Sequence, residues 1–247
     1  ALRLVGSEMC IRDRGIFMIY TGFWGFYAAC NVPLISPEVI GGEIVGTTWT
    51  ATNIYLAPTT LGAITVNFLL SLSGGLMATY IVSKGDAFWT FSGGLAGIIG
   101  ASAGNDLYHP MQALIIGAIV PVIAYKLHNY VERKFKIDDA VGAVAVHGYA
   151  GFLGVVIAGF VLWGAPSSPF EGYAVITPWG QLAGAIIMFL VLGFIPAYVV
   201  ARIQAARGTL RIPAEVELQG LDLGGQQAYD DAVAEITAAS AKHIKSK

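Results

Sequence analysis

The stretch KIDDAVGAVAVHGYAGFLGVVIAGFVLW, residues 136–163, decides the fold class of this chain. It begins with charged residues, and after Asp139 it contains no Asp, Glu, Lys or Arg. About twenty predominantly apolar residues are enough for a helix to cross a lipid bilayer. The stretch therefore predicts a transmembrane helix, which we place at residues 140–163.

One histidine, His147, lies within this predicted helix. Spacings of three and four residues place small side chains on the same face: Ala140, Ala143, Gly151, Gly154 and Ala158. Such small residues allow helices to approach closely, so this face predicts a helix–helix contact. Because an ionisable group near the middle of a membrane is costly, we interpret His147 as a functional residue. The alternative is a histidine that only hydrogen-bonds a neighbouring carbonyl and fixes the packing.

The composition predicts a multi-pass membrane protein. Hydrophobic residues make up 55% of the chain and charged residues 12%, whereas soluble domains carry about 25% charged residues. The net charge of −2 and the lack of a basic cluster give no indication of nucleic-acid binding. The two cysteines have no metal-binding spacing, and there is no HExxH motif or glycine-rich phosphate loop. We therefore predict no enzyme activity, no metal site and no cofactor.

Hydrophobic segments predict an all-α fold with six transmembrane helices in a membrane region that spans residues 15–203. The predicted helices are residues 16–34, 58–82, 87–104, 111–128, 140–163 and 178–203. Residues 36–57 form a connector rich in Gly, Thr and Pro, and residues 204–247 form a polar tail. Residues 1–14 lack the features of a signal peptide. Their SEMCIRDR string resembles translated sequencing adapter, so we expect these residues to be non-native.

The positive charges predict the orientation in the membrane. With six helices, all 14 Lys and Arg residues fall on one side. The positive-inside rule assigns that side to the cytoplasm. We therefore predict a protein of the inner or plasma membrane with both ends cytoplasmic.

Four segments carry a resemblance to the ammonium transporter (Amt/Mep/Rh) family. DDAVGAVAVHGYAGFLG (138–154) resembles the tenth helix, with its D-D-x7-H-G-x2-G-x2-G pattern. TGFWGFYAACN (21–31) is similar to the sixth helix, FSGGLAGIIG (91–100) to the short eighth helix, and RIPAEVELQGLDL (211–223) to the cytoplasmic tail. The segments follow one another in the order of the family.

The resemblance implies a fold that this chain matches only in part. The family has two inverted five-helix repeats and a closing eleventh helix, and the chain resembles the second repeat with the closing helix. The first repeat would supply the other half of the pore, with the second histidine of a pair. Transporter sites commonly lie at such a repeat interface. We therefore expect a fragment that is inactive alone.

The resemblance also implies a function, ammonium transport across the membrane. Ammonium would lose its proton, cross as ammonia past His147 and be protonated again inside. Ala143 would line the inner path, Phe26 would belong to a pair of phenylalanines that gates the outer vestibule, and Cys30 takes the place of a serine that helps to hold ammonium. The alternative for these three residues is ordinary packing.

The tail predicts regulation and partners. Residues 211–229 resemble the family's regulatory segment, which packs under a neighbouring subunit and receives the PII signalling protein; the matching residues include Gly220, Leu221, Asp222 and Tyr229. The resemblance thus implies a homotrimer in contact with membrane lipid, and the alternative is a solvated terminus. Two other functions stay open: an ammonium sensor or receptor on the same fold, and an Rh-type channel for ammonia or carbon dioxide.

Three further residues have a structural interpretation at this stage. His109 and His128 fall at the two ends of the predicted fourth helix, where we interpret them as interfacial residues. Gly142 stands where many family members have an aspartate, which we expect to loosen the start of the His147 helix.

Overall fold

The structure is a computed structural model, and the secondary structure that it describes covers residues 7–30, 35–41, 43–49, 51–54, 57–59, 61–137, 139–165, 174–211 and 234. Side chains are described for residues 14–29, 41, 61–137, 139–165, 174–211 and 234. The chain divides into two units, Ala1–Ala185 and Ile186–Lys247. Each unit is described by itself.

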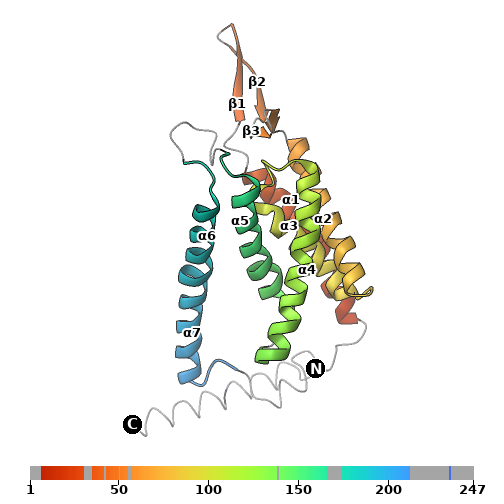
Figure 1. The fold of residues 1–247 in the computed structure, drawn as a ribbon, viewed down its shortest axis with the longest axis vertical. Helices are drawn as coiled ribbons and strands as arrows, with labels where there is room; N and C mark the ends of the chain where they lie inside the picture. The colour runs from red at the N-terminus through yellow and green to blue at the C-terminus, as the bar shows by residue number, and fades with distance from the viewer. Residues whose placement is uncertain are drawn as a thin grey trace. The chain divides into compact units, whose positions relative to one another are not determined.

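The first unit is built from helices (Figure 1). In chain order these are α1 (Ser7–Cys30), α2 (Leu61–Val82), α3 (Ala87–Ala101), the 3₁₀ segment η2 (Ser102–Gly104), α4 (Pro110–Phe135), the π segment η3 (Val144–Tyr149), α5 (Ala150–Val161) and α6 (Pro178–Ile186). Each predicted segment of this unit overlaps at least one of these helices. Helix α1 begins earlier than predicted, because its first two turns include the string that we set apart as non-native.

The connector between α1 and α2 contains two short hairpins that the sequence analysis did not predict. Strand β1 (Ile35–Ile40) pairs antiparallel with β2 (Glu43–Trp49), and β3 (Ala51–Ile54) pairs with β4 (Ala57–Thr59). Val, Ile and Thr recur in this segment and favour strands. Gly41, with φ +65°, supplies the left-handed residue of the first turn.

Helices α2, α3 and α4 pack closely through glycines. A Cβ added to Gly75 would lie 2.3 Å from the carbonyl oxygen of Gly93, and one added to Gly97 would lie 2.4 Å from that of Ser71. On α4, a Cβ on Gly117 would lie 2.5 Å from the Cα of Ser71. Close backbone approach of this kind is how helices associate in lipid, where the hydrophobic effect does not drive them together.

Helix α4 begins and ends at clear signals. Pro110 occupies the first turn, where its fixed φ suits a helix, and the His109 side chain accepts a hydrogen bond from the Met111 N–H at 3.2 Å. The helix continues to Phe135, seven residues beyond the predicted end, and Lys136 closes it with φ 56°. The residues from Glu132 to Lys134 are good helix formers, and no Gly or Pro interrupts residues 129–135, so the helix extends past the apolar stretch.

Four described helices are long and apolar enough to cross a membrane: Leu61–Val82, Pro110–Phe135, Val144–Val161 and Pro178–Ala206. Helix α3 has 15 residues, which agrees with the short third segment of the sequence analysis.

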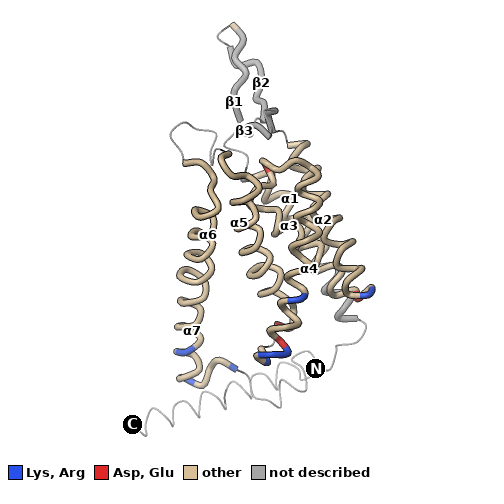
Figure 2. The backbone as a smooth tube through the Cα atoms, viewed as in Figure 1, with Lys and Arg blue, Asp and Glu red and all other residues tan. Residues whose placement is uncertain are grey.

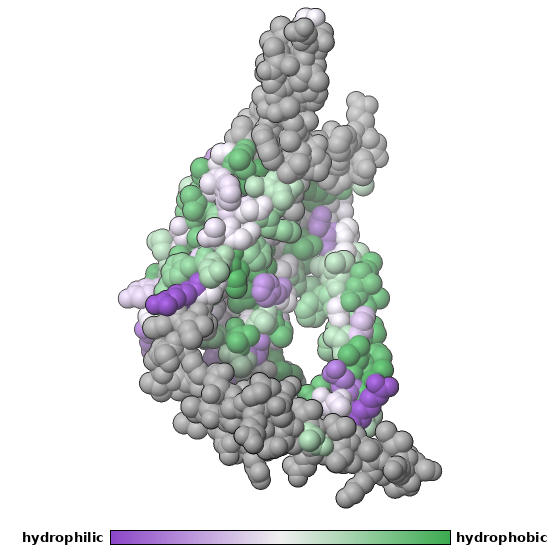
Figure 3. Space-filling view, turned by 180° about the vertical axis from the view of Figure 1, so that it is seen from behind, coloured by the Kyte–Doolittle hydropathy of each residue, from purple (hydrophilic) through white to green (hydrophobic). Residues whose placement is uncertain are grey.

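Hydrophobic residues cover much of the described helical surface on the face shown in Figure 3. Within the first unit, Lys and Arg gather at the end where α2 and α4 terminate (Figure 2).

The second unit contains the π segment η4 (Ile187–Phe194) and α7 (Ile195–Ala206). Neither element has a buried residue within the described part of the chain. Their large hydrophobic side chains, among them Leu192, Phe194 and Val200, are exposed. A helix that is hydrophobic all round requires lipid or other protein around it.

Candidate functional site

His147 lies in a π segment rather than in a regular α-helix. The Ala150 N–H donates to the carbonyl oxygen of Ala145, five residues earlier, at the end of η3. Ala145 and Val146 are buried, whereas the side chain of His147 is exposed. Single-turn π segments within helices are frequent at functional sites. The backbone geometry therefore indicates a functional site at this turn, independently of the presence of a histidine.

The π segment divides the small-residue face that the sequence predicted. Gly154 and Ala158 are buried, and a Cβ on Gly154 would lie 2.3 Å from the carbonyl oxygen of Gly100. Ala143 and His147, by contrast, are exposed. The prediction of one continuous contact face is thus wrong in its first half. A π turn holds more residues than an α turn, so the positions before it no longer align with those after it.

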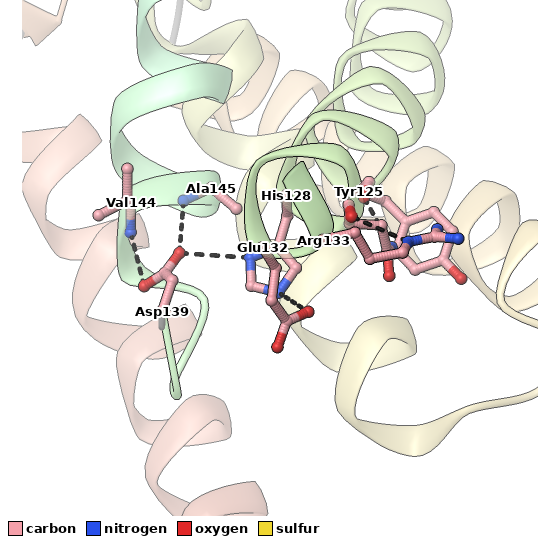
Figure 4. Close-up of polar contacts among 8 residues, drawn as sticks. Tyr125, His128, Glu132, Arg133, Asp139, Val144 and Ala145 are labelled. Atoms are coloured by element: carbon pink, nitrogen blue, oxygen red, sulfur yellow. Dashed lines mark hydrogen bonds and ion pairs between the residues drawn. The ribbon is translucent and has the colours of Figure 1, made fainter. Parts of the chain in front are cut away.

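Asp139 caps the start of the segment that carries His147 (Figure 4). Its Oδ1 accepts a hydrogen bond from the Val144 N–H at 3.2 Å, and its Oδ2 accepts one from the Ala145 N–H at 3.0 Å. The first N–H groups of a helix lack partners within it, and a carboxylate there both satisfies them and complements the helix dipole. Asp139 therefore fixes the position of η3.

Gly142 permits the turn between Asp139 and η3. Its φ of +69° lies in the left-handed region, and its N–H donates to the Asp139 carbonyl oxygen at 2.8 Å. A side chain is strained in this conformation, whereas glycine adopts it freely. The expectation that Gly142 loosens the start of the helix is therefore corrected: the glycine closes a hydrogen-bonded turn.

His128 of α4 contacts the same carboxylate. Its Nδ1 lies 3.4 Å from Asp139 Oδ2, and its Nε2 lies 3.7 Å from Glu132 Oε2 (Figure 4). The side chains of His128 and Asp139 are 10% and 12% exposed, and that of Glu132 is 52% exposed. This contact was not predicted, because the predicted fourth helix ended at residue 128, whereas the chain continues past it and returns to α4 at Asp139.

An aromatic side chain completes the surroundings of His128. The ring of Trp89, on α3, lies 4.6 Å from the imidazole in an edge-to-face arrangement, and the ring of Tyr125 lies 5.0 Å from that of Trp89. Trp89 is itself positioned by the cap of α3, since its N–H donates to Asp86 Oδ1 at 2.9 Å. The start of α3 and the last turns of α4 thus meet the start of η3. They form one cluster, composed of Trp89, Tyr125, His128 and Asp139.

Phe26, another predicted site residue, lies apart from this cluster. Phe26 is on α1 with 58% of its surface exposed, and its ring lies 6.0 Å from Phe23 and 6.1 Å from Tyr27. Helix α1 packs against α2 and α3, and η3 packs against α3 and α4. The side chain of Cys30 and the tail residues Gly220, Leu221, Asp222 and Tyr229 lie outside the described residues.

Tyr27 attaches α1 to α3, which the sequence analysis did not anticipate. Its hydroxyl donates to the carbonyl oxygen of Ile98 at 2.7 Å and contacts Ser102 Oγ. Tyr20, two turns earlier on the same face, donates to the carbonyl oxygen of Phe91. These hydroxyls hold the helix that carries Phe26.

A buried polar cluster lies at the opposite end of the first unit from His128. Asn67 Nδ2 donates to the carbonyl oxygens of Asn105 and Tyr108, each at 2.8 Å, and all three residues are buried. Burial raises the pKa of the neighbouring Asp106 carboxyl above its ordinary value. Among the described residues, no group of three or more His, Cys, Asp or Glu is placed to hold a metal ion.

Comparisons with known proteins agree with this fold. The sequence pattern of the Ammonium Transporter Family matches residues 14–229. The chain is 31% identical to the ammonium transporter Amt2 of Methanocaldococcus jannaschii, over 89% of this chain and 46% of that protein. It is 27% identical to the ammonium transporter 1 member 2 of Oryza sativa subsp. japonica, over 94% of this chain and 48% of that protein.

One solved structure shares the fold. A protein described as a Sensor Amt Protein superimposes with a TM-score of 0.53 at 24% sequence identity, over 67% of this chain and 42% of that chain. The present chain therefore spans about half the length of the relatives that it matches.

Proposed function

The chain belongs to the ammonium transporter family, and we propose that it forms the half of an ammonium conduction path that carries His147. The observation that carries this proposal is the exposed His147 on a π segment within the matched residues. The family match supports ammonium as the substrate. The π segment supports His147 as the residue beside the path. The relatives contain a further segment that this chain does not match. A segment of that kind would supply the other half of the path.

The proposed mechanism separates the proton from the nitrogen. Moving an intact cation through an apolar path costs several kcal/mol or more, whereas neutral ammonia avoids this cost. An imidazole has one nitrogen that accepts and one that donates, so His147 is suited to transfer the proton beside the path. Ala143, which precedes His147 by one turn, would line the inner path; its exposure supports this role.

Two further roles belong to the proposal at the outer end. Phe26 gates the vestibule, supported by its exposed position on α1 beside Phe23. Cys30, four residues later, helps to hold ammonium in place of a serine, and its thiol would do so more weakly than a hydroxyl.

The assembly and its orientation are proposed on sequence grounds. The cations of the first unit gather at the end where α2 and α4 terminate (Figure 2), which the positive-inside rule places in the cytoplasm of an inner or plasma membrane. The tail that includes Gly220, Leu221, Asp222 and Tyr229 would contact a neighbouring subunit of a trimer and receive PII.

The decisive experiment uses the complete reading frame that encodes this chain. Ammonium-dependent current is measured in proteoliposomes for the wild type, for His147→Asp and for His109→Asn, a matched control at the exposed start of α4. We expect current in the wild type and in His109→Asn and loss of it in His147→Asp. Equal current in all three would overturn the role of His147, and no current in the wild type would overturn transport.

A second candidate function is ammonium sensing, which the Sensor Amt Protein among the structural relatives favours. A sensor on this fold would bind ammonium without sustained current. Binding measured by calorimetry, together with the absence of current in the same proteoliposomes, would support sensing over transport.

A further inference from the structure

One carboxylate joins three elements at the start of the His147 segment. Asp139 accepts hydrogen bonds from the Val144 and Ala145 N–H groups and also lies 3.4 Å from the imidazole of His128 (Figure 4). Asp139 Oδ2 is shared, because it receives the Ala145 N–H and faces His128 Nδ1 at once. The position of η3 therefore depends on the groups that contact the Asp139 carboxylate.

The fold brings His128 to Asp139 by reversing the chain after α4. Lys136 ends the helix with φ 56°, in the left-handed conformation. Gly142, with φ +69°, turns the chain again into η3. Asp139 lies between these two turns and returns to a position beside α4, nearly two turns before the end of that helix.

The groups that face His128 come from three elements. Asp139 precedes η3, Glu132 lies one turn further along α4, and the Trp89 ring comes from α3. Tyr149 of η3 interacts electrostatically with Asp139. Two positive groups lie near His128 in sequence: Lys126, which is exposed, and Arg133, which donates its Nε–H to the carbonyl oxygen of Asn129 at 3.0 Å. The charged groups that contact His128 among the described residues are thus two carboxylates, of which Asp139 is the less exposed.

We propose that His128 is a positioning residue for His147: when protonated, it holds the Asp139 carboxylate against the first N–H groups of η3. An imidazolium forms an ion pair with Asp139 and a cation–π contact with Trp89, whereas a neutral imidazole offers at most a hydrogen bond. Histidine changes charge between pH 5 and 8. The start of η3 is therefore held more firmly in acid than in alkali.

This inference rests on the proposed function only for its effect on transport. The contact of His128 with Asp139 is present in the chain whether or not His147 lines a conduction path. Two of the three tests below need no transport, so a failure of this inference is distinguishable from a failure of the proposed function.

The first test follows the protonation of His128 through Trp89. An imidazolium in contact with an indole quenches its fluorescence, so the Trp89 emission, obtained as the difference between wild type and Trp89→Phe in detergent micelles, should rise from pH 5 to pH 8. His128→Asn should abolish the rise, and His109→Asn, on the same helix, should retain it. The same rise in His128→Asn would overturn the proposal.

The second test measures the hold on η3 by hydrogen exchange. Asparagine places an amide N–H where the imidazole Nδ1 lies, whereas alanine provides no donor. The Val144 and Ala145 amides should exchange about tenfold faster in His128→Ala, the size of a lost helix cap. His128→Asn, which supplies a neutral donor, should restore part of the protection but not all of it. Equal exchange in His128→Ala and wild type, after correction for the intrinsic rate, would overturn the proposal.

The third test applies where the complete protein carries ammonium current. The His128→Ala variant should lower the current about tenfold, as expected from a loosened cap. His128→Asn should recover most of the current but lose the part of its pH dependence that falls between pH 5 and 8. A merely structural histidine would give the same pH profile in wild type and His128→Asn, and that result would overturn the proposal.

Discussion

The imidazole Nδ1 of His128 and the carboxylate Oδ2 of Asp139 lie 3.4 Å apart, with both side chains almost buried. They are eleven positions apart in sequence, and the end of α4 and the left-handed residue Lys136 lie between them. The last turns of one membrane helix are thereby joined to the first turn of the next.

Replacement of Asp139 should destabilise the first unit. Asp139→Ala removes both acceptors of the η3 cap, so the free energy of unfolding should fall by about 1–2 kcal/mol. Titration with a denaturing detergent measures this loss. Glu132→Gln is the matched control, because Glu132 is exposed and caps no helix. A control that loses as much as Asp139→Ala would contradict the capping role.

Gly154 should tolerate no larger side chain. In Gly154→Ala the new Cβ would lie 2.3 Å from the Gly100 carbonyl oxygen, so α5 must move away from α3. Overpacking of this kind costs about 1–3 kcal/mol, measurable as a lowered thermal midpoint in detergent. Gly151→Ala is the control on the same helix, since its nearest neighbour, Ile99, would be 3.7 Å away. Equal losses would argue against tight packing at Gly154.

The Tyr27 hydroxyl should hold α1 against α3. Tyr27→Phe removes its hydrogen bond to the Ile98 carbonyl oxygen and its contact with Ser102. The expected loss in the free energy of unfolding is about 1 kcal/mol. The control is Thr21→Val on the same helix, whose exposed hydroxyl bonds only the Phe17 carbonyl oxygen within α1. Faster hydrogen exchange along α1 in Tyr27→Phe, but not in Thr21→Val, would support the prediction.

Asp106 should make stability depend on pH. Because burial raises the pKa of its carboxyl in the folded chain, folding favours the protonated form. Its favourable contribution is complete below the ordinary pKa of 3.8 and is lost as the pH rises through the folded-state value. Asp106→Asn should therefore be more stable than the wild type at neutral pH and no more stable below pH 3.8. Unfolding titrations at the two pH values measure the difference, and a constant difference would contradict it.

The helical fold could be predicted from the sequence because each segment carries its own signal. Apolar length predicted α2, α4 and the helix that begins at Pro178. The ends were less predictable. The apolar stretch ends near His128, whereas the backbone remains helical to Phe135. Polar residues can also favour a helix, so the end of the apolar stretch does not mark the end of the helix.

The site was predicted less completely, for two physical reasons. The helical-wheel argument assumed α geometry throughout, and the π segment at Val144–Tyr149 breaks that assumption just where His147 lies. The contact of His128 with Asp139 is tertiary and depends on backbone turns at Lys136 and Gly142. A left-handed lysine has no signal in a single sequence.

The π turn around His147 also has a consequence for how the chain tolerates insertions and deletions. A π turn is in effect an α turn with one surplus residue, and removal of that residue would leave an unbroken α-helix. Every side chain on the Asp139 side of the deletion would then rotate by about 100° relative to α5. In this part of the chain the spacing of residues along the backbone, as much as their chemical identity, sets the direction in which the imidazole points.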